Sequence, residues 1–308
     1  MNILMLGGTT FLGIHMTEAL RRRGHRVTHF TRRTMGDRRT DLARTGTQTW
    51  DGVIDNCGYH PRDVEISARY FANRTGRYVF TSTISVYDAS APALDEDSLQ
   101  TINEPYGSGK AACERVVVST FRQRALVLRP GLIAGPYDPT DRFTYWPRRF
   151  ARGGEILAPE SAAFATQVID ARDIADFTAR ALERDLGGTY NLTSSPGTIT
   201  LGDVFDACRD VSRLSSTVRW ASAEFLSDQG VGAWVDMPLW IPATAGLPGM
   251  LNVAVRRALI ASLTYRPLRE TVRDTLAWHL TCAQRLPLLA GLSVACEREL
   301  LLALHADT

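Results

Sequence analysis

The sequence predicts an α/β protein built on a doubly wound parallel sheet, with a second, smaller α+β lobe. Short apolar strands alternate with amphipathic helices through the first half of the 308-residue chain, and a glycine-rich turn joins the first strand to the first helix. After Pro136 the composition changes to aromatic- and proline-rich segments without a regular hydrophobic periodicity, such as 143–150 and 234–242. The second lobe is therefore expected to begin there.

The expected strands and helices follow one another in a regular order. A strand at 2–6, a helix ending near Gly24 and a strand at 26–30 open the chain, and glycine suits the position just after a helix end. A helix is expected from Pro105, where proline lacks only an N–H that the first helical turn leaves unpaired. Another is expected around 173–177. Further strands are expected at 52–55, 77–80, 125–128, 167–170 and 188–192.

Composition excludes several classes of protein. A hydrophobic content of 44% and a net charge of +2 are those of an ordinary globular protein, with no electrostatic case for nucleic acid or an anionic membrane. No run of 18 apolar residues occurs, and the opening residues do not resemble a signal peptide, so a cytoplasmic location is expected. Five cysteines without a CxxC pair predict reduced thiols and no metal site. They are Cys57, Cys113, Cys208, Cys282 and Cys296.

The glycine turn after the first strand indicates a dinucleotide cofactor. In the pattern GxxGxxG, Gly7 makes the tight turn and Gly13 lets the helix approach the strand, so that a pyrophosphate can rest on the helix N-terminus. The middle position is Thr10 here, and Gly8 is an additional glycine. The alternative is a plain tight turn between strand and helix. The cofactor-binding residues expected in this turn are Gly7, Thr9, Thr10, Phe11, Leu12 and Gly13.

The end of the second strand bears on the type of cofactor. An acid at this position usually binds the ribose 2′-hydroxyl of NAD, whereas a nearby arginine accommodates the 2′-phosphate of NADP. Here Thr31 is followed by Arg32 and Arg33, with no acid. The sequence therefore favours NADP, with NAD as the alternative if these arginines are incidental surface charges.

A single lysine among 35 basic residues is the sharpest catalytic signal. Lys110 lies four residues after Tyr106, so both side chains are on the same face of a helix. An ammonium group stabilises phenolate and lowers the tyrosine pKa from about 10, which makes the phenol a usable general acid and base. The alternative is that this YxxxK sequence arises by chance.

These residues together resemble the extended short-chain dehydrogenase/reductase family, also called the NAD-dependent epimerase/dehydratase family. The resemblance covers nearly the whole chain. It rests on the glycine turn, 53–55, 81–87, the YxxxK sequence, 129–136, 170–175, the strand after Gly188 and 265–278. It implies a catalytic triad of Thr83, Tyr106 and Lys110. It also implies cofactor contacts by Tyr106 and Lys110 and by Asp37, Arg38, Cys57, Thr81 and Pro130.

The resemblance also implies a domain plan. Residues 1–135 would form a dinucleotide-binding Rossmann domain, to which 165–195 return, and 136–164 and 196–308 would form the substrate-binding lobe. Within that plan, Ser85, Tyr145, Trp146 and Arg149 are the substrate candidates. The last three are equally well explained as core and rim of the second lobe. His60, after the third strand, is a weak catalytic candidate, and an ordinary loop histidine is the favoured interpretation. His15 is expected to be a packed or solvated helix residue.

Two departures from the family pattern affect the expected function. Only 18 residues lie between Arg33 and Gly52, where the family normally fits a helix and a third strand. The adenosine side of the cofactor site is thus shortened. In addition, nucleotide-sugar enzymes of the family usually carry an asparagine where this chain has Leu132, so the segment looks more like the reductase branch.

Three functions remain open on the sequence alone. The first is an NAD(P)-dependent oxidoreductase that reduces a carbonyl or oxidises an alcohol of a small molecule, with Tyr106 as acid and base. The second is a nucleotide-sugar epimerase or dehydratase with tightly bound NAD. The third is a non-catalytic protein on the same scaffold. The small-molecule partner is unidentified, and a homodimer is possible.

Overall fold

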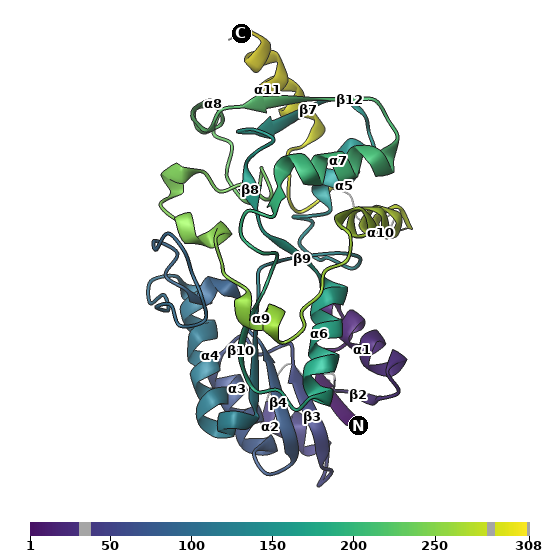
Figure 1. Cartoon of the computed structure of the whole chain (residues 1–308), viewed down its shortest axis with the longest axis vertical. Coiled ribbons are helices and arrows are strands. Elements are labelled where there is room, and N and C mark those ends of the chain that lie inside the picture. Colours follow the sequence, from purple (N-terminus) through teal and green to yellow (C-terminus); the bar gives the residue numbers. More distant parts are fainter. Residues whose placement is uncertain (31–37, 282–286, 307–308) are drawn as a thin grey trace. The chain divides into compact units, whose positions relative to one another are not determined.

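The computed structural model describes residues 1–30, 38–281 and 287–306, and the chain divides into two compact units (Figure 1). Unit 1 comprises Met1–Gly131, Ala171–Thr193 and Val253–Thr264, and unit 2 comprises Leu132–Asp170, Ser194–Asn252 and Tyr265–Thr308. On the sequence alone, residues 253–264 are expected in the second lobe. In the structure this segment carries helix α9 (Arg256–Ile260), which packs against a strand of unit 1.

Unit 1 contains a six-stranded sheet whose strands are all parallel, in the order β10-β5-β4-β3-β1-β2. The strands are β1 (Asn2–Leu6), β2 (Arg26–Phe30), β3 (Trp50–Asp55), β4 (Thr75–Thr81), β5 (Ala125–Pro130) and β10 (Gly188–Leu192). Every residue of β5 is buried, because an inner strand of a parallel sheet is covered on both faces. The strand order reverses between β1 and β3, and ligands of such sheets bind at the carboxyl ends around this point. The predicted Rossmann-type sheet is confirmed.

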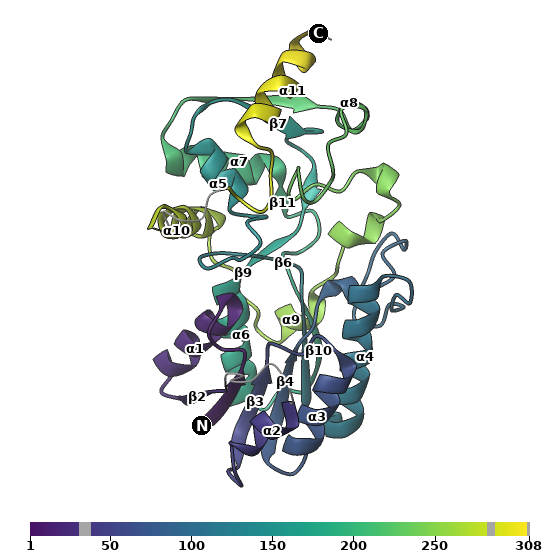
Figure 2. The same ribbon diagram turned by 180° about the vertical axis from the view of Figure 1, so that it is seen from behind.

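The helices of unit 1 cover both faces of the sheet. Figures 1 and 2 show α1 and α6 together on one face and α3 and α4 together on the other. The helices are α1 (Phe11–Arg22), α2 (Arg38–Ala43), α3 (Pro61–Phe71), α4 (Pro105–Phe121), α6 (Ala171–Glu183) and α9, with the short 3-10 turns η1 (Ile84–Val86) and η2 (Arg122–Arg124). A buried cluster that includes Phe71, Tyr78, Phe80 and Phe121 joins α3 and α4 to the strands.

The shortened segment after β2 leaves the sheet one strand narrower than the family pattern implies. Within the described residues, α2 leads directly to β3, and β2 forms one edge of the sheet. Helix α2 packs against α3. Among the described residues, the strand order thus lacks the third strand that the family normally places in this segment.

Unit 2 combines three small two-stranded sheets with helices. Its strands are β6 (Leu132–Ala134), β7 (Gly154–Pro159), β8 (Ala165–Thr166), β9 (Val168–Asp170), β11 (Ile199–Thr200) and β12 (Ser216–Ala221). Its helices are α5 (Tyr145–Phe150), α7 (Leu201–Ser212), α8 (Ala223–Asp228), α10 (Leu268–Thr281) and α11 (Val294–Ala306), with η3 (Ala243–Ala245) and η4 (Pro248–Leu251). The pairs are β6 with β9 and β7 with β12, both parallel, and β8 with β11, antiparallel.

Aromatic side chains build the core of unit 2. The ring centres of Trp146 and Phe205 are 4.5 Å apart. The Phe205 ring also stacks on Trp220, with a distance of 5.4 Å between the ring centres. Phe150 and Trp240 are buried in the same cluster. The aromatic- and proline-rich segments that lack a period in the sequence therefore form a core of irregular loops and short helices.

Candidate functional site

The glycine turn brings the N-terminus of α1 directly onto the end of β1. Gly7 has φ +77°, a conformation that favours glycine. A Cβ on Gly13 would overlap the carbonyl oxygen of Gly7 and would lie 2.7 Å from the Cα of Gly8, so only glycine permits this approach. No acidic residue lies in the first turn of α1, which leaves the positive end of the helix dipole available for an anion.

The other residues of the glycine turn differ in exposure and in backbone conformation. Thr9 and Thr10 are exposed, and Thr10 precedes the helix in an extended conformation. Phe11 begins the helix with φ +32°, a strained value for a residue with a bulky side chain, whereas Leu12 is buried in the unit. A Cβ on Gly8 would lie 2.5 Å from Met5 Cγ, which explains the additional glycine as a packing requirement.

Polar side chains connect the carboxyl ends of the strands next to this turn. Asn56, just after β3, donates its backbone N–H to the Leu6 carbonyl of β1 (2.9 Å), and its side-chain oxygen accepts from Thr81 Oγ1 at the end of β4 (2.5 Å). Cys57 is half-buried, and its N–H donates to Asp55 Oδ1 (3.0 Å). Pro130 is buried at the end of β5, the next strand in the sheet.

Lys110 lies at the same edge of the sheet. Its ammonium group donates to the carbonyl oxygens of Gly58 (2.8 Å) and Thr81 (2.6 Å), and the residue is only 3% exposed. Burial lowers the pKa of Lys110, and the carboxylate of Asp55 acts in the opposite direction. An ammonium group has three donors, so two carbonyl acceptors leave one N–H to be directed at another group.

The segment that carries Thr83 packs closely against the first turn of α4, which carries Tyr106. Tyr106 lies one helical turn before Lys110 and is 48% exposed. A Cβ on Gly107 would overlap the carbonyl oxygen of Ser85, so the segment after β4 rests on the first turn of α4. Thr83 is buried, accepts from the Ser85 N–H (3.1 Å) and donates to Ser85 Oγ (3.2 Å).

The first turn of α4 is capped by a carboxylate. Glu104 accepts from the backbone N–H of Tyr106 (2.9 Å) and from that of Gly107. A negative charge at this end of a helix is favourable, since it meets the unpaired N–H groups and the positive end of the dipole. The cap therefore fixes where α4 begins, and with it the position of Tyr106.

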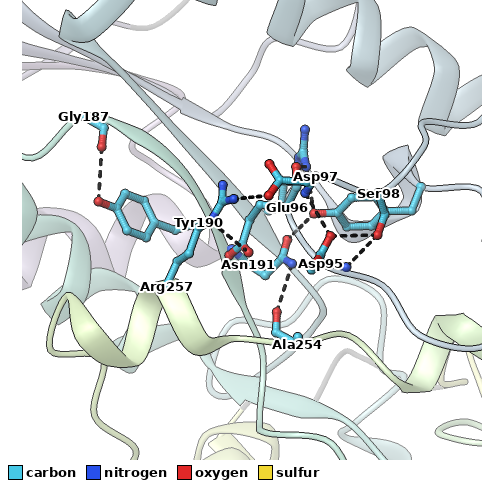
Figure 3. A network of polar contacts seen from close by, with 11 residues as sticks. Asp95, Glu96, Asp97, Ser98, Gly187, Tyr190, Asn191, Ala254 and Arg257 are labelled. Atoms are coloured by element: carbon cyan, nitrogen blue, oxygen red, sulfur yellow. Dashed lines mark hydrogen bonds and ion pairs between the residues drawn. The ribbon is translucent and has the colours of Figure 1, made fainter.

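A polar network holds the long segment between β4 and α4 (Figure 3). Glu96 accepts from the Asn191 N–H on β10 (3.0 Å) and lies 3.7 Å from the Nε of Arg257 on α9. Asn191 also donates to the Ala254 carbonyl (3.0 Å), and Arg257 pairs with Asp97. The segment that leads to Tyr106 is therefore tied to β10 and to 253–264.

Several predicted cofactor residues are not part of this arrangement. Arg32, Arg33 and Asp37 lie outside the described residues. Arg38 is buried at 6% exposure and pairs with Asp55 (2.8 Å). The same guanidinium donates to Ser67 Oγ (2.6 Å) on α3, so it anchors α2 against β3 and α3, and we do not retain it as a cofactor ligand.

The substrate candidates of unit 2 lie in its core. Tyr145 and Trp146 are 2% and 0% exposed, and the indole N–H of Trp146 donates to the Pro238 carbonyl (2.9 Å). Arg149 is buried against Glu297, with Nε 2.6 Å from Oε2, and also donates to the Gly153 carbonyl (2.9 Å). Burial leaves these side chains no surface for a substrate, so the packing alternative explains them.

Two residues that contribute to the site, Gly58 and Tyr59, are not predicted from the sequence. Gly58 supplies a carbonyl to Lys110, and a Cβ there would lie 2.6 Å from Val64 Cγ2 and 2.7 Å from Phe80 Cε2. Tyr59 places its ring 5.3 Å from the same ammonium. The only signal in the sequence is a glycine close after a strand end. His60 is exposed just before α3, whereas His15 is buried on α1.

Comparison with known proteins agrees with this geometry. The family model described as "NAD dependent epimerase/dehydratase family" matches residues 64–193, a range that includes Thr83, Tyr106 and Lys110. The resemblance to this family is thereby confirmed. No curated protein sequence matches the chain.

Several solved structures share the fold of the chain at low sequence identity. WbmH of Bordetella bronchiseptica, in complex with NAD⁺, is 17% identical with a TM-score of 0.66, covering 91% of this chain and 98% of its own. The UDP-N-acetylglucosamine 4-epimerase of Bacillus cereus is 17% identical with a TM-score of 0.65, covering 90% and 98%. The human epimerase family protein SDR39U1, with NADPH, is 19% identical with a TM-score of 0.62, covering 90% and 99%.

The described residues contain neither a metal-ligand cluster nor a membrane-spanning helix. Across 1–30, 38–281 and 287–306, no three His, Cys, Asp or Glu side chains are grouped as metal ligands would be. None of the helices in these ranges is long and apolar enough to cross a membrane.

Proposed function

We propose that the protein is an NAD(P)-dependent oxidoreductase that reduces a carbonyl, or oxidises an alcohol, of a small-molecule substrate. The observation that carries the proposal is the arrangement of Tyr106 and Lys110. The half-exposed phenol lies in the first turn of helix α4, and the lysine one turn later reaches the carboxyl ends of β3 and β4. Those strand ends lie beside the glycine turn, where sheets of this kind bind their cofactor.

Each residue of the site would have a separate task. Tyr106 donates a proton to the substrate oxygen in reduction, or removes it in oxidation. Lys110, held by two carbonyl groups, keeps a positive charge next to the helix face that carries the tyrosine. Thr83 would turn its single hydroxyl proton from Ser85 Oγ to the same substrate oxygen, where negative charge develops in the transition state.

The residues also fit a dinucleotide. Gly7, Gly13 and the acid-free first turn of α1 would hold the pyrophosphate, and Thr81, Cys57 and Pro130 lie at the neighbouring strand ends. When bound, the nicotinamide supplies or accepts the hydride. We propose NADP(H) over NAD(H), on the ground of Arg32 and Arg33 and the missing acid after β2.

A second candidate is net epimerisation or dehydration of a nucleotide-linked sugar. The structures with TM-scores of 0.65 and 0.62 named as UDP-N-acetylglucosamine 4-epimerase and UDP-glucose 4-epimerase favour it. Leu132 opposes it. This residue packs in the apolar core of unit 2, where those enzymes usually place an asparagine. The two functions differ in stoichiometry, because an epimerase returns its hydride and a reductase consumes one NADPH per product.

The first experiment measures cofactor content and use. The purified protein is denatured, the supernatant is read at the nicotinamide absorbance, and NAD and NADP are titrated into the native protein. Tight NAD that turns over without net consumption would favour the epimerase. Absence of bound cofactor together with no affinity for either nucleotide would favour the non-catalytic protein and would overturn the proposal.

The second experiment removes the proposed acid and base. With a panel of carbonyl substrates and NADPH, Tyr106→Phe is expected to lose at least ~10²-fold in turnover, the lower end for a general acid. Tyr70→Phe on α3 is the matched control, because the Tyr70 hydroxyl donates to the carbonyl of Gly46 (2.8 Å), which is not a residue of the proposed site. Near-normal turnover in Tyr106→Phe would refute the mechanism.

The other expectations of partner and location stay predictions. A cytoplasmic protein acting on a small molecule, without nucleic acid or membrane as partner, agrees with the balanced charge of +2. A homodimer is possible, and light scattering of the purified protein would test it.

A further inference from the structure

The ammonium group of Lys110 is enclosed by two carbonyl oxygens and two aromatic rings. In addition to its hydrogen bonds, Nζ lies 4.3 Å from the centre of the Phe80 ring and 5.3 Å from that of Tyr59. Both distances are within the range in which a cation is attracted to a ring face. We call Gly58, Tyr59, Phe80 and Thr81 the lysine cage.

The members of the cage differ in their exposure. Phe80 is fully buried, Gly58 is buried and Thr81 is half-buried, whereas Tyr59 is 55% exposed. Lys110 itself is 3% exposed. Of the four, Tyr59 therefore forms the outer side of the cage, between the ammonium group and solvent.

Close packing determines where Tyr59 lies. A Cβ on Gly58 would meet both Val64 and Phe80, so the segment after β3 rests directly on the buried ring. On the other side, a Cβ on Gly109 of α4 would lie 3.9 Å from the Tyr59 carbonyl oxygen, an ordinary contact. The backbone of Tyr59 is thus held between the sheet and the helix that carries Lys110.

We propose that Tyr59 is a positioning residue whose ring closes the lysine cage and holds the Lys110 ammonium at the ends of β3 and β4. The inference rests on the proposed function in one respect, that the positioned lysine serves Tyr106. Two N–H groups of the Lys110 ammonium donate to carbonyl oxygens, so in the closed cage the third N–H can point in only one direction. Burial in the cage also agrees with the lowered pKa of Lys110.

The single lysine of the chain permits a direct test. The native protein is treated with acetic anhydride over a range of pH, and acetylation of Lys110 is followed by mass spectrometry of its peptide. The pH dependence separates the rate constant of the neutral amine from the pKa. A Lys110→Arg variant identifies the background from the α-amino group.

Tyr59→Ala is expected to raise the rate constant for acetylation of the neutral Lys110 amine at least about tenfold, because the cage is then open to the reagent. A tenfold change corresponds to about 1.4 kcal/mol of protection. Because burial is the largest influence on the pKa of Lys110 and lowers it, opening the cage to water should also raise that pKa toward its ordinary value of about 10.4. Tyr59→Phe, which keeps the ring, should retain the slow rate and the original pH profile. Tyr70→Ala controls for the loss of a tyrosine elsewhere in unit 1.

Two results would overturn the proposal. One is an unchanged acetylation rate in Tyr59→Ala, and the other is an equal change in Tyr59→Phe and Tyr59→Ala, which would assign the effect to the hydroxyl group. The measurement needs neither cofactor nor substrate. If Tyr106→Phe retains turnover, the proposed function fails, while the result for the cage stands independently.

Discussion

Glu114 on helix α4 and Arg129 on strand β5 form a two-point ion pair, with Nε–Oε1 2.9 Å and Nη2–Oε2 2.6 Å. Both side chains are buried, at 5% and 6% exposure. Arg129 also donates to Tyr87 Oη (2.7 Å), and burial raises the pKa of that phenol to about 12. Glu114 lies one helical turn after Lys110, so the pair fastens to the sheet the same helix that positions the proposed catalytic groups.

Breaking this pair on one side should be costly. Arg129→Met leaves the Glu114 carboxylate buried without its partner, and we expect a loss of about 3–5 kcal/mol in the free energy of unfolding. Urea denaturation measures it. Glu65→Gln, which breaks the exposed pair of Glu65 and Arg69 on α3, should cost no more than about 0.5 kcal/mol. Equal effects of the two substitutions would contradict the assignment of Arg129 as an anchor.

Two glycines of α4 should respond oppositely to alanine. Gly109→Ala meets only an ordinary contact, so the gain in helix propensity should stabilise the protein by up to about 1 kcal/mol. Gly107→Ala would collide with the Ser85 carbonyl, and we expect a loss of about 1–3 kcal/mol together with lower turnover, because Thr83 and Tyr106 move apart. Thermal unfolding and activity of both variants check this. A stabilised, fully active Gly107→Ala would show that the contact is unimportant.

Cofactor choice tests the arginines after β2. A charge-assisted contact to a 2′-phosphate is worth roughly 1.5–3 kcal/mol, which is about ten- to a hundredfold in affinity. We therefore expect NADP(H) to bind at least about tenfold more tightly than NAD(H), and Arg32→Ala with Arg33→Ala to abolish the difference. Arg62→Ala, at an exposed position of α3, is the matched control in the same titration. Equal affinities in the unmodified protein would make both arginines ordinary surface charges.

Acid should weaken the contact between α1 and α6. Hydrogen bonds from Arg23, joined by His25, lower the pKa of Glu183 from 4.5 to about 2. Because the pKa is depressed in the folded state, the stabilisation is present above about 4.5 and is lost as pH falls toward 2. Glu183→Gln should therefore lower the melting temperature at pH 7. As the pH falls toward 2, the melting temperatures of the variant and the parent protein should become equal. Exposed Glu224→Gln should leave the pH dependence as it is.

The sequence alone predicted the parts of this protein that depend on near neighbours in the chain. The apolar runs that became β1, β2, β3, β4, β5 and β10 are present, as are the glycine turn and the helix that carries Tyr106 and Lys110. The short segment between Arg33 and Gly52 likewise indicated a shortened adenosine side, and among the described residues α2 leads directly to β3. A strand or helix is decided by the periodicity of a few consecutive residues, which a single sequence displays directly.

Only the tertiary structure decided which side chains meet. Lys110 binds the carbonyls of Gly58 and Thr81, which are 52 and 29 residues away in the chain. Tyr145 and Trp146 are of residue types that are common in binding sites, yet they are buried in the core of unit 2. Similarly, Arg38 pairs with Asp55 inside the fold. Such partners are selected when distant segments pack and every buried polar group must find a hydrogen bond, and no pattern of neighbouring residues specifies that choice.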